Sequence, residues 1–203
     1  MGMAIQPLCE LAQEIFVGIP IPRGEKAEEG AVAYPVINVR DIVDGRVAPF
    51  DILDIVHFSA RSAIDRYRVC AGDVLLTSRG TQLKVALVGT EVVGAVATSN
   101  LLVIRPGGQF PGALMYAYLC SPSAQGLLMN SSRSSAGLLA LTAREVGEVR
   151  IPVPPMERLQ QLARLVEETE QYYYAAVAAA LVAREAAQGV VMAELRGLAR
   201  GGQ

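Results

Sequence analysis

Short apolar runs alternate with turn residues over the first 150 positions of the chain. The runs have the length of buried strands, and Gly, Pro and Asp separate them. The predicted strands are Val36–Val39, Val74–Thr77, Val85–Val88, Ala95–Thr98, Leu101–Ile104 and Val149–Val153. We therefore expect this part of the chain to form a mixed, β-rich domain.

Two short helices and one helical turn are predicted late in this domain. The first covers Gly112–Cys120, and the second runs from an N-cap at Ser121 to about Met129, with proline at its first helical position. Thr142 and Glu145 have the spacing of a capping box, which predicts a single turn of helix.

A different pattern begins after the stiff segment Pro152–Pro155. From Met156 to about Leu198 the chain lacks proline and is rich in Ala, Glu, Gln, Leu and Arg. One helix of that length extends roughly 60 Å. The predicted fold class is α+β: a mixed, β-rich domain in residues 1–155, followed by one long C-terminal helix in residues 156–203 that has a coiled-coil pattern.

Apolar and small residues recur along this helix at the alternating spacing of three and four that is typical of a coiled-coil seam. The seam consists of Leu159, Leu162, Val166, Thr169, Tyr173, Ala176, Ala180, Ala183, Ala187 and Val190. Such a helix either packs on its own domain or pairs with another helix. Because its length exceeds what one domain of this size covers, we favour pairing.

Composition narrows the classes of protein that need to be considered. Apolar residues make up 52 % of the 203 residues, which excludes a disordered chain. No uninterrupted apolar run approaches the roughly 20 residues of a membrane span, and the N-terminus has no signal-peptide pattern. The three cysteines, Cys9, Cys70 and Cys120, fit neither a zinc site nor a disulfide framework. We expect buried thiols in a reducing cytoplasm.

Candidate catalytic chemistry is sparse. His57 is the only histidine and lies in an apolar run, so a strand or core residue is expected there. Gly80–Lys84 lacks the spacing of a phosphate-binding loop. Asp41 and Asp44 could be taken for a carboxylate pair, but Asp44 precedes Gly45 and predicts a turn. A hydrolase that uses Ser or Asp is the weakest of the hypotheses kept open.

Nucleic-acid binding has more support and one objection. The net charge of −2 opposes DNA affinity, which depends on neutralising phosphates. The local distribution of charge matters more, and a separate acidic region could leave one face basic. Seven cations cluster within 45 positions: Arg40, Arg46, Arg61, Arg66, Arg68, Arg79 and Lys84. The small, polar segment Asn130–Gly137 adds Arg133 and Ser134.

The segment Tyr67–Thr81 combines a turn, a buried strand and a cationic loop. Gly72 and Asp73 form the turn dipeptide, and the strand then leads to Ser78, Arg79 and Thr81 at a glycine-broken end. These side chains are suited to hydrogen bonding with phosphates or base edges.

In their order along the chain, these motifs resemble the specificity subunit of type I restriction-modification systems: one target-recognition domain and the helix that follows it. The resembling segments are Leu11–Ile15 with Gly18, Tyr34–Ile42 with Gly45, Tyr67–Thr81 with Lys84–Ala86, Ser99–Arg105, Tyr116–Ser123 and Leu138–Pro155. Two departures stand out. Met156–Leu159 replaces the usual continuation after the prolines, which displaces Gln160 and Gln161. The chain also has one domain and one helix where the family usually has two of each.

The resemblance implies a non-catalytic protein that recognises half of a split DNA target and binds methyltransferase subunits through its helix. It implies double-stranded DNA, a modification subunit, and in some systems a restriction subunit as partners, with no cofactor in this chain and no membrane. It also implies that a half-length subunit acts as a homodimer whose seam packs on its own copy. The expected DNA-binding residues are Ser78, Arg79, Thr81, Gln82, Lys84, Arg40, Arg133 and Ser134. The alternative from another class is an oligomerising protein–protein adaptor that does not bind DNA.

Overall fold

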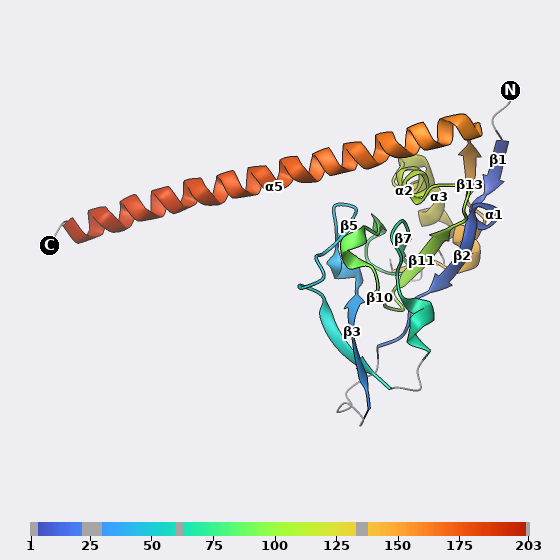
Figure 1. Ribbon diagram of the computed structural model, residues 1–203, viewed down its shortest axis with the longest axis horizontal. Coiled ribbons are helices and arrows are strands. Elements are labelled where there is room, and N and C mark those ends of the chain that lie inside the picture. Colours follow the sequence, from blue (N-terminus) through green and yellow to red (C-terminus); the bar gives the residue numbers. More distant parts are fainter. Residues whose placement is uncertain (1–3, 22–29, 60–62, 133–137, 202–203) are drawn as a thin grey trace. The chain divides into compact units, whose positions relative to one another are not determined.

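The computed structural model describes residues 4–21, 30–59, 63–132 and 138–201. The chain divides into two compact units, Met1–Ala163 and Arg164–Gln203. The first is α+β and is built on small sheets, and the second consists of the greater part of one long helix (Figure 1). The predicted fold class is therefore confirmed.

The central sheet of the first unit is antiparallel, in the order β2-β11-β7-β9. Its strands are β2 (Ala12–Val17), β11 (Leu101–Pro106), β7 (Val74–Thr77) and β9 (Val85–Leu87). A second, mixed sheet has the order β10-β3-β6, in which β10 (Val96–Ala97) is parallel to β3 (Val32–Ile37) and β6 (Asp54–Phe58) is antiparallel to it. The central strand β7 is wholly buried, as its unbroken apolar run predicted.

Three two-stranded pairs complete the unit. They are β1 (Ala4–Pro7) with β13 (Arg150–Val153), β4 (Ile42–Val43) with β5 (Arg46–Val47), and β8 (Arg79–Gly80) with β12 (Leu139–Ala140). The β4–β5 hairpin turns at Asp44 and Gly45, whose φ angles of 47° and 83° are those of a tight hairpin turn. The turn that the sequence predicted at this dipeptide is therefore present.

Short helices connect and cover these sheets. The helices of the first unit are α1 (Leu8–Leu11), α2 (Gly112–Leu119), α3 (Pro122–Ser131) and α4 (Ala143–Gly147), with 3-10 turns η1 (Val39–Asp41), η2 (Ile64–Tyr67) and η3 (Thr90–Val92). The Ser121 side chain caps α3, and Thr142 and Glu145 form the predicted capping box of α4. The core lies against the central sheet and includes Phe16, Leu75 and Val103.

The long helix α5 (Met156–Gly201) begins directly after the proline-rich segment. Leu159 and Ala163 are buried in the first unit, at 3 % and 6 % exposure, so the first two turns of α5 belong to that unit. By length and composition alone, α5 is apolar enough to cross a membrane, with no more than two charged residues in the relevant window. Isolated charges interrupt the apolar runs of α5, so its capacity to span a membrane is not visible from uninterrupted runs alone.

One further expectation from the sequence is corrected, and another is confirmed. Cys9, Cys70 and Cys120 were expected to be buried, but all three side chains are exposed. A strand or core residue was expected at His57, and His57 lies on the strand β6, with its side chain exposed. Apolar neighbours in the sequence therefore do not determine which face of a strand a side chain occupies.

Candidate functional site

The loop between β7 and β9 carries most of the polar residues that the sequence assigned to a binding face. Its base is closed by two backbone-directed bonds. Thr77 N donates to the Lys84 carbonyl at 3.0 Å, and Lys84 N donates to Thr77 Oγ1 at 3.0 Å. The intervening residues therefore leave and re-enter the buried sheet at adjacent points.

Ser78 anchors the start of this loop and does not reach its surface. The side chain is buried at 2 % exposure, and its hydroxyl donates to the Ser99 carbonyl at 3.1 Å. Its backbone N–H donates to Asn100 O at 2.8 Å, and its carbonyl accepts from Leu141 N at 2.8 Å. The expected DNA contact from Ser78 is thus replaced by a structural role.

Arg79, Thr81 and Gln82 form the exposed part of the loop. Arg79 pairs through its backbone with Ala140 in the β8–β12 ladder, which holds the start of the exposed segment in an extended conformation. Within the described part of the chain, the Arg79 guanidinium has neither an ion-pair nor a hydrogen-bond partner. This charge is therefore available to an external ligand.

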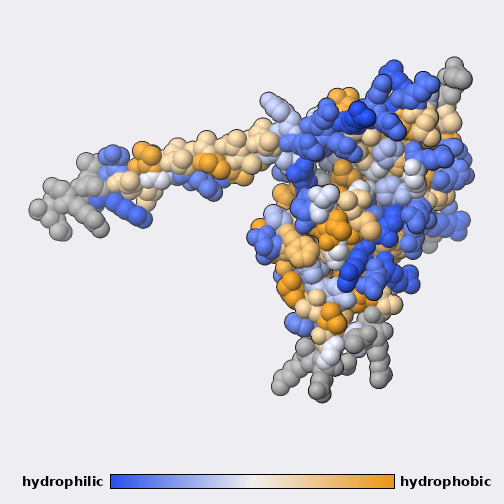
Figure 2. Space-filling model, in the orientation of Figure 1, coloured by the Kyte–Doolittle hydropathy of each residue, from blue (hydrophilic) through white to orange (hydrophobic). Residues whose placement is uncertain are grey.

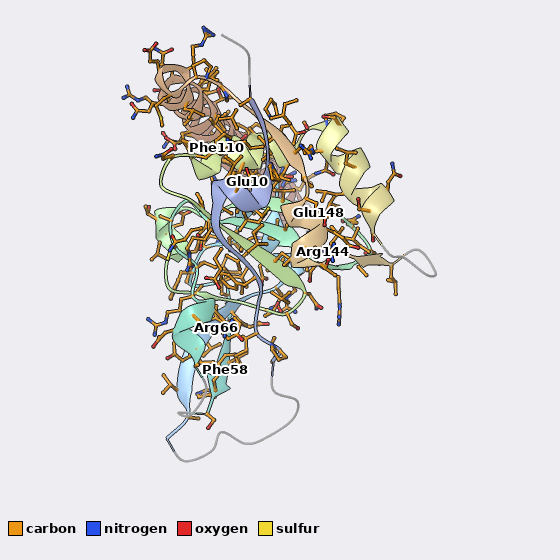
Figure 3. The ribbon with its side chains drawn as sticks, turned by 90° about the vertical axis from the view of Figure 1, so that its right-hand side faces the viewer. Glu10, Phe58, Arg66, Phe110, Arg144 and Glu148 are labelled. Atoms are coloured by element: carbon orange, nitrogen blue, oxygen red, sulfur yellow. The ribbon has the colours of Figure 1, made fainter. Side chains whose placement is uncertain are left out.

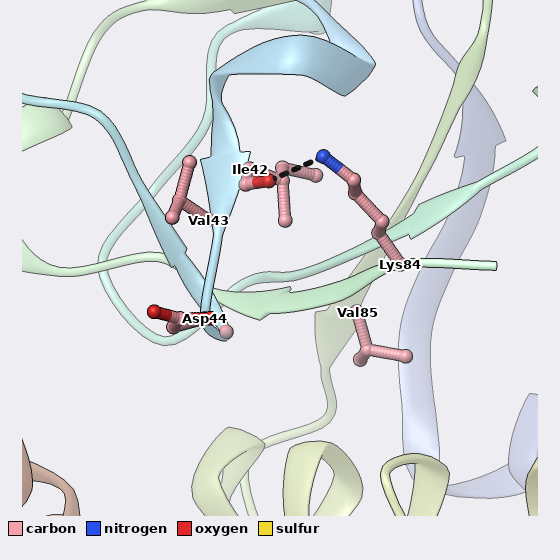
Figure 4. A pocket seen from close by; sticks show the side chains of 6 residues that line it. Ile42, Val43, Asp44, Lys84 and Val85 are labelled. Carbon is pink, nitrogen blue, oxygen red and sulfur yellow. Dashed lines mark hydrogen bonds between the residues drawn. The ribbon is translucent and has the colours of Figure 1, made fainter. Parts of the chain in front are cut away.

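Lys84 ends the loop with its charge directed inward. The ammonium group of half-buried Lys84 donates to the carbonyl of Ile42 at 2.7 Å (Figure 4). It also donates to the carbonyl of Val39, the first residue of η1, at 3.2 Å. Lys84 also lines a hollow with Ile42–Gly45 and Val85. Its main contacts are internal, which the sequence did not indicate.

The remaining predicted DNA contacts have separate surroundings. Arg40 lies on η1, next to the carbonyls that hold Lys84, and its exposed guanidinium forms ion pairs with Asp41 and Asp54. The structure therefore brings Arg40 and Lys84 to one region. Arg133 and Ser134 lie outside the described residues.

The Gly72-Asp73 turn precedes β7 and is fixed by internal hydrogen bonds. Gly72 has a φ of 84°, which favours glycine, and the Asp73 side chain is 1 % exposed. Its carboxylate accepts from Arg105 Nε at 3.1 Å, from Arg105 Nη2 at 2.8 Å and from Cys70 N at 2.8 Å. Hydrogen bonding to Asp73 raises the pKa of Arg105, against the opposing effect of burial, so Arg105 stays charged at any pH of interest.

Charge is distributed almost evenly between the two parts of the chain. Residues 1–155 hold 13 of the 18 basic and 14 of the 20 acidic residues. The long helix therefore does not carry a separate acidic excess that would leave the first unit basic. Any affinity of the first unit for DNA depends on where individual cations lie and which of them lack a carboxylate partner.

The described residues contain no metal-binding grouping. No group of three or more His, Cys, Asp or Glu side chains there has the arrangement of a metal site. His57, the single candidate for a histidine-based triad, is exposed on β6.

The second unit exposes the predicted helix seam. Ala176, Ala180, Ala183 and Ala187 are exposed, and Tyr173 and Val190 are 47 % and 65 % exposed. Figure 2 shows a largely apolar surface along this stretch. Leu159, the first predicted seam residue, is instead buried in the first unit, and Leu162 and Val166 are half-buried.

A hollow on α5 has the lining of a coiled-coil hole. It is lined by Arg184, Ala187, Gln188, Val191 and Met192, of which the first four have the spacing of such a hole. Positions 184, 187, 188 and 191 are spaced as i, i+3, i+4 and i+7, so they lie on one face of the helix. In a coiled coil, four residues with this spacing form the hole that accepts one side chain of the facing helix.

Comparison with known proteins identifies the fold. No family model matches the sequence, and neither does any curated protein. Among solved structures, the HsdS subunit from Thermoanaerobacter tengcongensis matches 85 % of this chain with a TM-score of 0.60 and 18 % identity. A second structure, described as the basis of complex assembly and conformational transition of the type I R-M system, matches 86 % with a TM-score of 0.59 and 18 % identity. The chain spans 43 % and 40 % of the lengths of those two chains.

Proposed function

We propose that this chain is a half-length DNA specificity subunit of a type I restriction-modification system, acting as a homodimer in the cytoplasm. The proposal rests on a fold shared over 85 % of the chain with an HsdS subunit that is about twice as long. One copy supplies one target-recognition domain and one helix, so a two-fold dimer restores two of each. The protein is not itself an enzyme; modification subunits, and a restriction subunit where present, carry the catalysis and its cofactors.

Base recognition is assigned to the exposed segment of the β7–β9 loop. Arg79 and Gln82 have the side chains that pair with guanine and adenine in the major groove, and Thr81 can accept or donate beside them. Arg79 carries the proposal among these residues because its guanidinium is exposed and lacks a partner in the described structure. Ser78 and Lys84 hold the two ends of the segment. Arg40 is a weaker candidate for a DNA contact, because its guanidinium already pairs with Asp41 and Asp54.

The symmetry of the α5 seam supports pairing with an antiparallel copy. Three pairs of seam residues are equidistant from a point between Leu181 and Val182: Ala180 with Ala183, Ala176 with Ala187, and Tyr173 with Val190. An antiparallel copy centred there places alanine opposite alanine in the middle and one Tyr173–Val190 layer at each end. A parallel copy would place two tyrosines at one end and two valines at the other, so the helices would diverge. Opposed helix dipoles also favour the antiparallel arrangement.

The hollow around Ala187 fits this register. In this antiparallel register, Val177 of one copy lies opposite position 186 of the other copy. It is therefore beside that copy's Ala187, the small residue in the lining of the hollow. A valine side chain is a suitable knob for a four-residue hole of this kind. Exposed apolar surface on α5 is then covered by protein and not by lipid.

Selection from a pool of random duplexes tests the function. The purified chain is incubated with duplexes of about four helical turns at low salt, and the retained DNA is sequenced. The expected result is an enriched motif in two parts that form an inverted repeat, with binding strengthened by the modification subunit. Retention without any enriched motif would overturn the proposal.

An adaptor that oligomerises without binding DNA is the second candidate, and the near balance of charge in residues 1–155 favours it. The same experiment separates the two candidates. An adaptor dimerises through α5 but retains no duplex above the level of a bovine albumin control, even at low salt.

A further inference from the structure

Two arginines outside the β7–β9 loop lie against tyrosine rings: Arg66 in η2, and Arg68, which directly follows η2. The Arg66 guanidinium carbon lies 5.0 Å from the centroid of the Tyr67 ring. Tyr67 in turn meets the buried Phe16 edge-on, with the ring centroids 6.3 Å apart. A guanidinium on a ring that is itself packed against the core has fewer accessible rotamers than an ordinary surface arginine.

The neighbouring Arg68 repeats this arrangement. Its guanidinium carbon lies 5.0 Å from the centroid of the Tyr34 ring, and Tyr34 meets Phe58 edge-on at 6.1 Å. Phe58 is 2 % exposed and belongs to β6, and Figure 3 shows Arg66 and Phe58 at the same end of the unit. Each of the two arginines is thus supported by a tyrosine that is wedged against a buried phenylalanine.

The segment is also tied to the interior through Arg105. Arg105 Nη2 donates to the Arg68 carbonyl at 2.9 Å, and the same guanidinium lies 5.5 Å from the Phe16 ring centroid. Because Arg105 is held by Asp73, the backbone that presents the two arginines is linked to a buried ion pair. We call the surface formed by Arg66, Tyr67, Arg68 and Tyr34 the arginine–tyrosine ledge.

The charges of the ledge are only partly neutralised. Arg66 has no carboxylate partner among the residues that the structure describes. Arg68 pairs with Asp65 at 3.1 Å, but both side chains are exposed, at 44 % and 88 %, so water screens the pair. An oriented guanidinium without a carboxylate partner is a hydrogen-bond donor suited to a phosphate oxygen.

We infer that the arginine–tyrosine ledge binds phosphates of the DNA backbone, as a positioning contact distinct from the base-reading loop. This inference rests on the proposed DNA-binding function. Stacking on the tyrosine rings holds each guanidinium in one place, and a fixed cation suits a contact that positions the protein on the DNA backbone. The contribution of the ledge is therefore equal for every sequence and depends on salt.

Titration of binding against salt tests the ledge. Affinities of the wild type, Arg66→Ala and Arg68→Ala are measured from 0.05 to 0.5 M salt, on the selected duplex and on a scrambled one. Each loss of a phosphate contact is expected to reduce the slope of log K against log salt by about one. At 0.15 M salt the affinity should fall about fivefold on both duplexes alike.

Two further variants separate the ledge from a general effect of charge. Arg150→Ala removes an exposed cation from β13 and should leave the slope unchanged. Arg66→Lys keeps the charge and loses the planar stack, so its slope should match the wild type while its affinity falls less than that of Arg66→Ala.

The outcomes distinguish this inference from the proposed function. Sequence-selective binding by the wild type with unchanged slopes in both alanine variants would overturn the ledge alone. Absence of wild-type binding at 0.05 M salt would overturn both. A slope reduced equally by Arg150→Ala would also reject the ledge, because the effect would then belong to net charge.

Discussion

Arg105 donates two hydrogen bonds to the carboxylate of Asp73, at 3.1 and 2.8 Å, and this carboxylate is almost completely buried. The pair joins β11 to the turn before β7, so the two central strands share one electrostatic contact as well as their ladder. The turn dipeptide that introduces the candidate site is therefore part of the framework and not of the binding surface.

Replacing Asp73 should destabilise the fold strongly. Asp73→Ala leaves Arg105 without its partner in a largely buried setting, which costs about 3 kcal/mol. Urea unfolding followed by circular dichroism gives the free energy directly. The matched control is Asp65→Ala, which breaks an exposed pair with Arg68 and should cost less than about 1 kcal/mol. Equal losses in the two variants would contradict the assigned role of Asp73.

Within the β7–β9 loop, adjacent residues should respond in opposite ways. Arg79→Ala is expected to leave the free energy of unfolding unchanged and to relax preference at one base position, a difference of about 1–3 kcal/mol between the right and wrong base. Ser78→Ala removes a buried hydrogen bond and should cost about 1 kcal/mol of stability without altering which base is preferred. Selection from random duplexes and urea unfolding measure the two effects. A relaxed motif in Ser78→Ala would reject this division of roles.

The long helix allows a similar contrast. Ala180→Glu places a charge at the proposed interface and should convert the dimer to a folded monomer, as measured by light scattering. Leu159→Ala lies in the same heptad pattern but acts within the first unit, where the buried side chain is lost. It should cost about 2–5 kcal/mol of stability and leave dimerisation intact. An unchanged mass for Ala180→Glu would reject the proposed seam.

Cross-linking distinguishes the polarity of the dimer. In a chain whose three exposed cysteines, Cys9, Cys70 and Cys120, are replaced by serine, Tyr173→Cys and Val190→Cys are introduced into separate preparations. Mixing the two should give a disulfide-linked heterodimer under oxidation, because the antiparallel register places these positions opposite each other. Cross-linking of the Tyr173→Cys chain with itself would indicate a parallel pair.

Replacement of glycine by alanine should lower the free energy of unfolding at one helical position, Gly112, and raise it at another, Gly126. A Cβ at Gly112 would lie 1.9 Å from the Gly72 carbonyl oxygen, so Gly112→Ala must displace backbone and should cost about 1–3 kcal/mol or more. A Cβ at Gly126 meets no atom within 4 Å outside its own helix turn, and Gly126→Ala should stabilise by about 0.5–1 kcal/mol. Thermal and urea unfolding of both variants give the comparison. A stable Gly112→Ala protein would mean that α2 does not approach the turn this closely.

The sequence predicted the elements of this fold better than the roles of its polar residues. The strand Val74–Thr77, the helix after Pro111 and the start of α5 follow from local periodicity and capping, which act over a few residues. The strand β1 was missed because it is short and obtains its partner from β13, far away in the chain.

The polar residues of the loop could not be separated by local pattern. Ser78 and Arg79 are adjacent and both hydrophilic, yet one is buried because Ser99 offers a carbonyl and the other is exposed. Lys84 was assigned to DNA because it is a cation near other cations, while its ammonium position is set by Val39 and Ile42, some 40 residues earlier in the sequence. Such assignments depend on distant parts of the chain, and periodicity contains no information about them.

The closure of the β7–β9 loop has a consequence for how the protein could change its target. Thr77 and Lys84 bond to each other at the base, and Ser78 and Lys84 are each fastened to carbonyls elsewhere. Under the proposed function, the exposed side chains of residues 79–83 could be exchanged with little effect on the framework, except at Gly80, where a Cβ would lie 3.3 Å from Thr77 Cγ2. New recognition sites could evolve, or be engineered, by rewriting this short stretch while the remainder of the protein stays as it is.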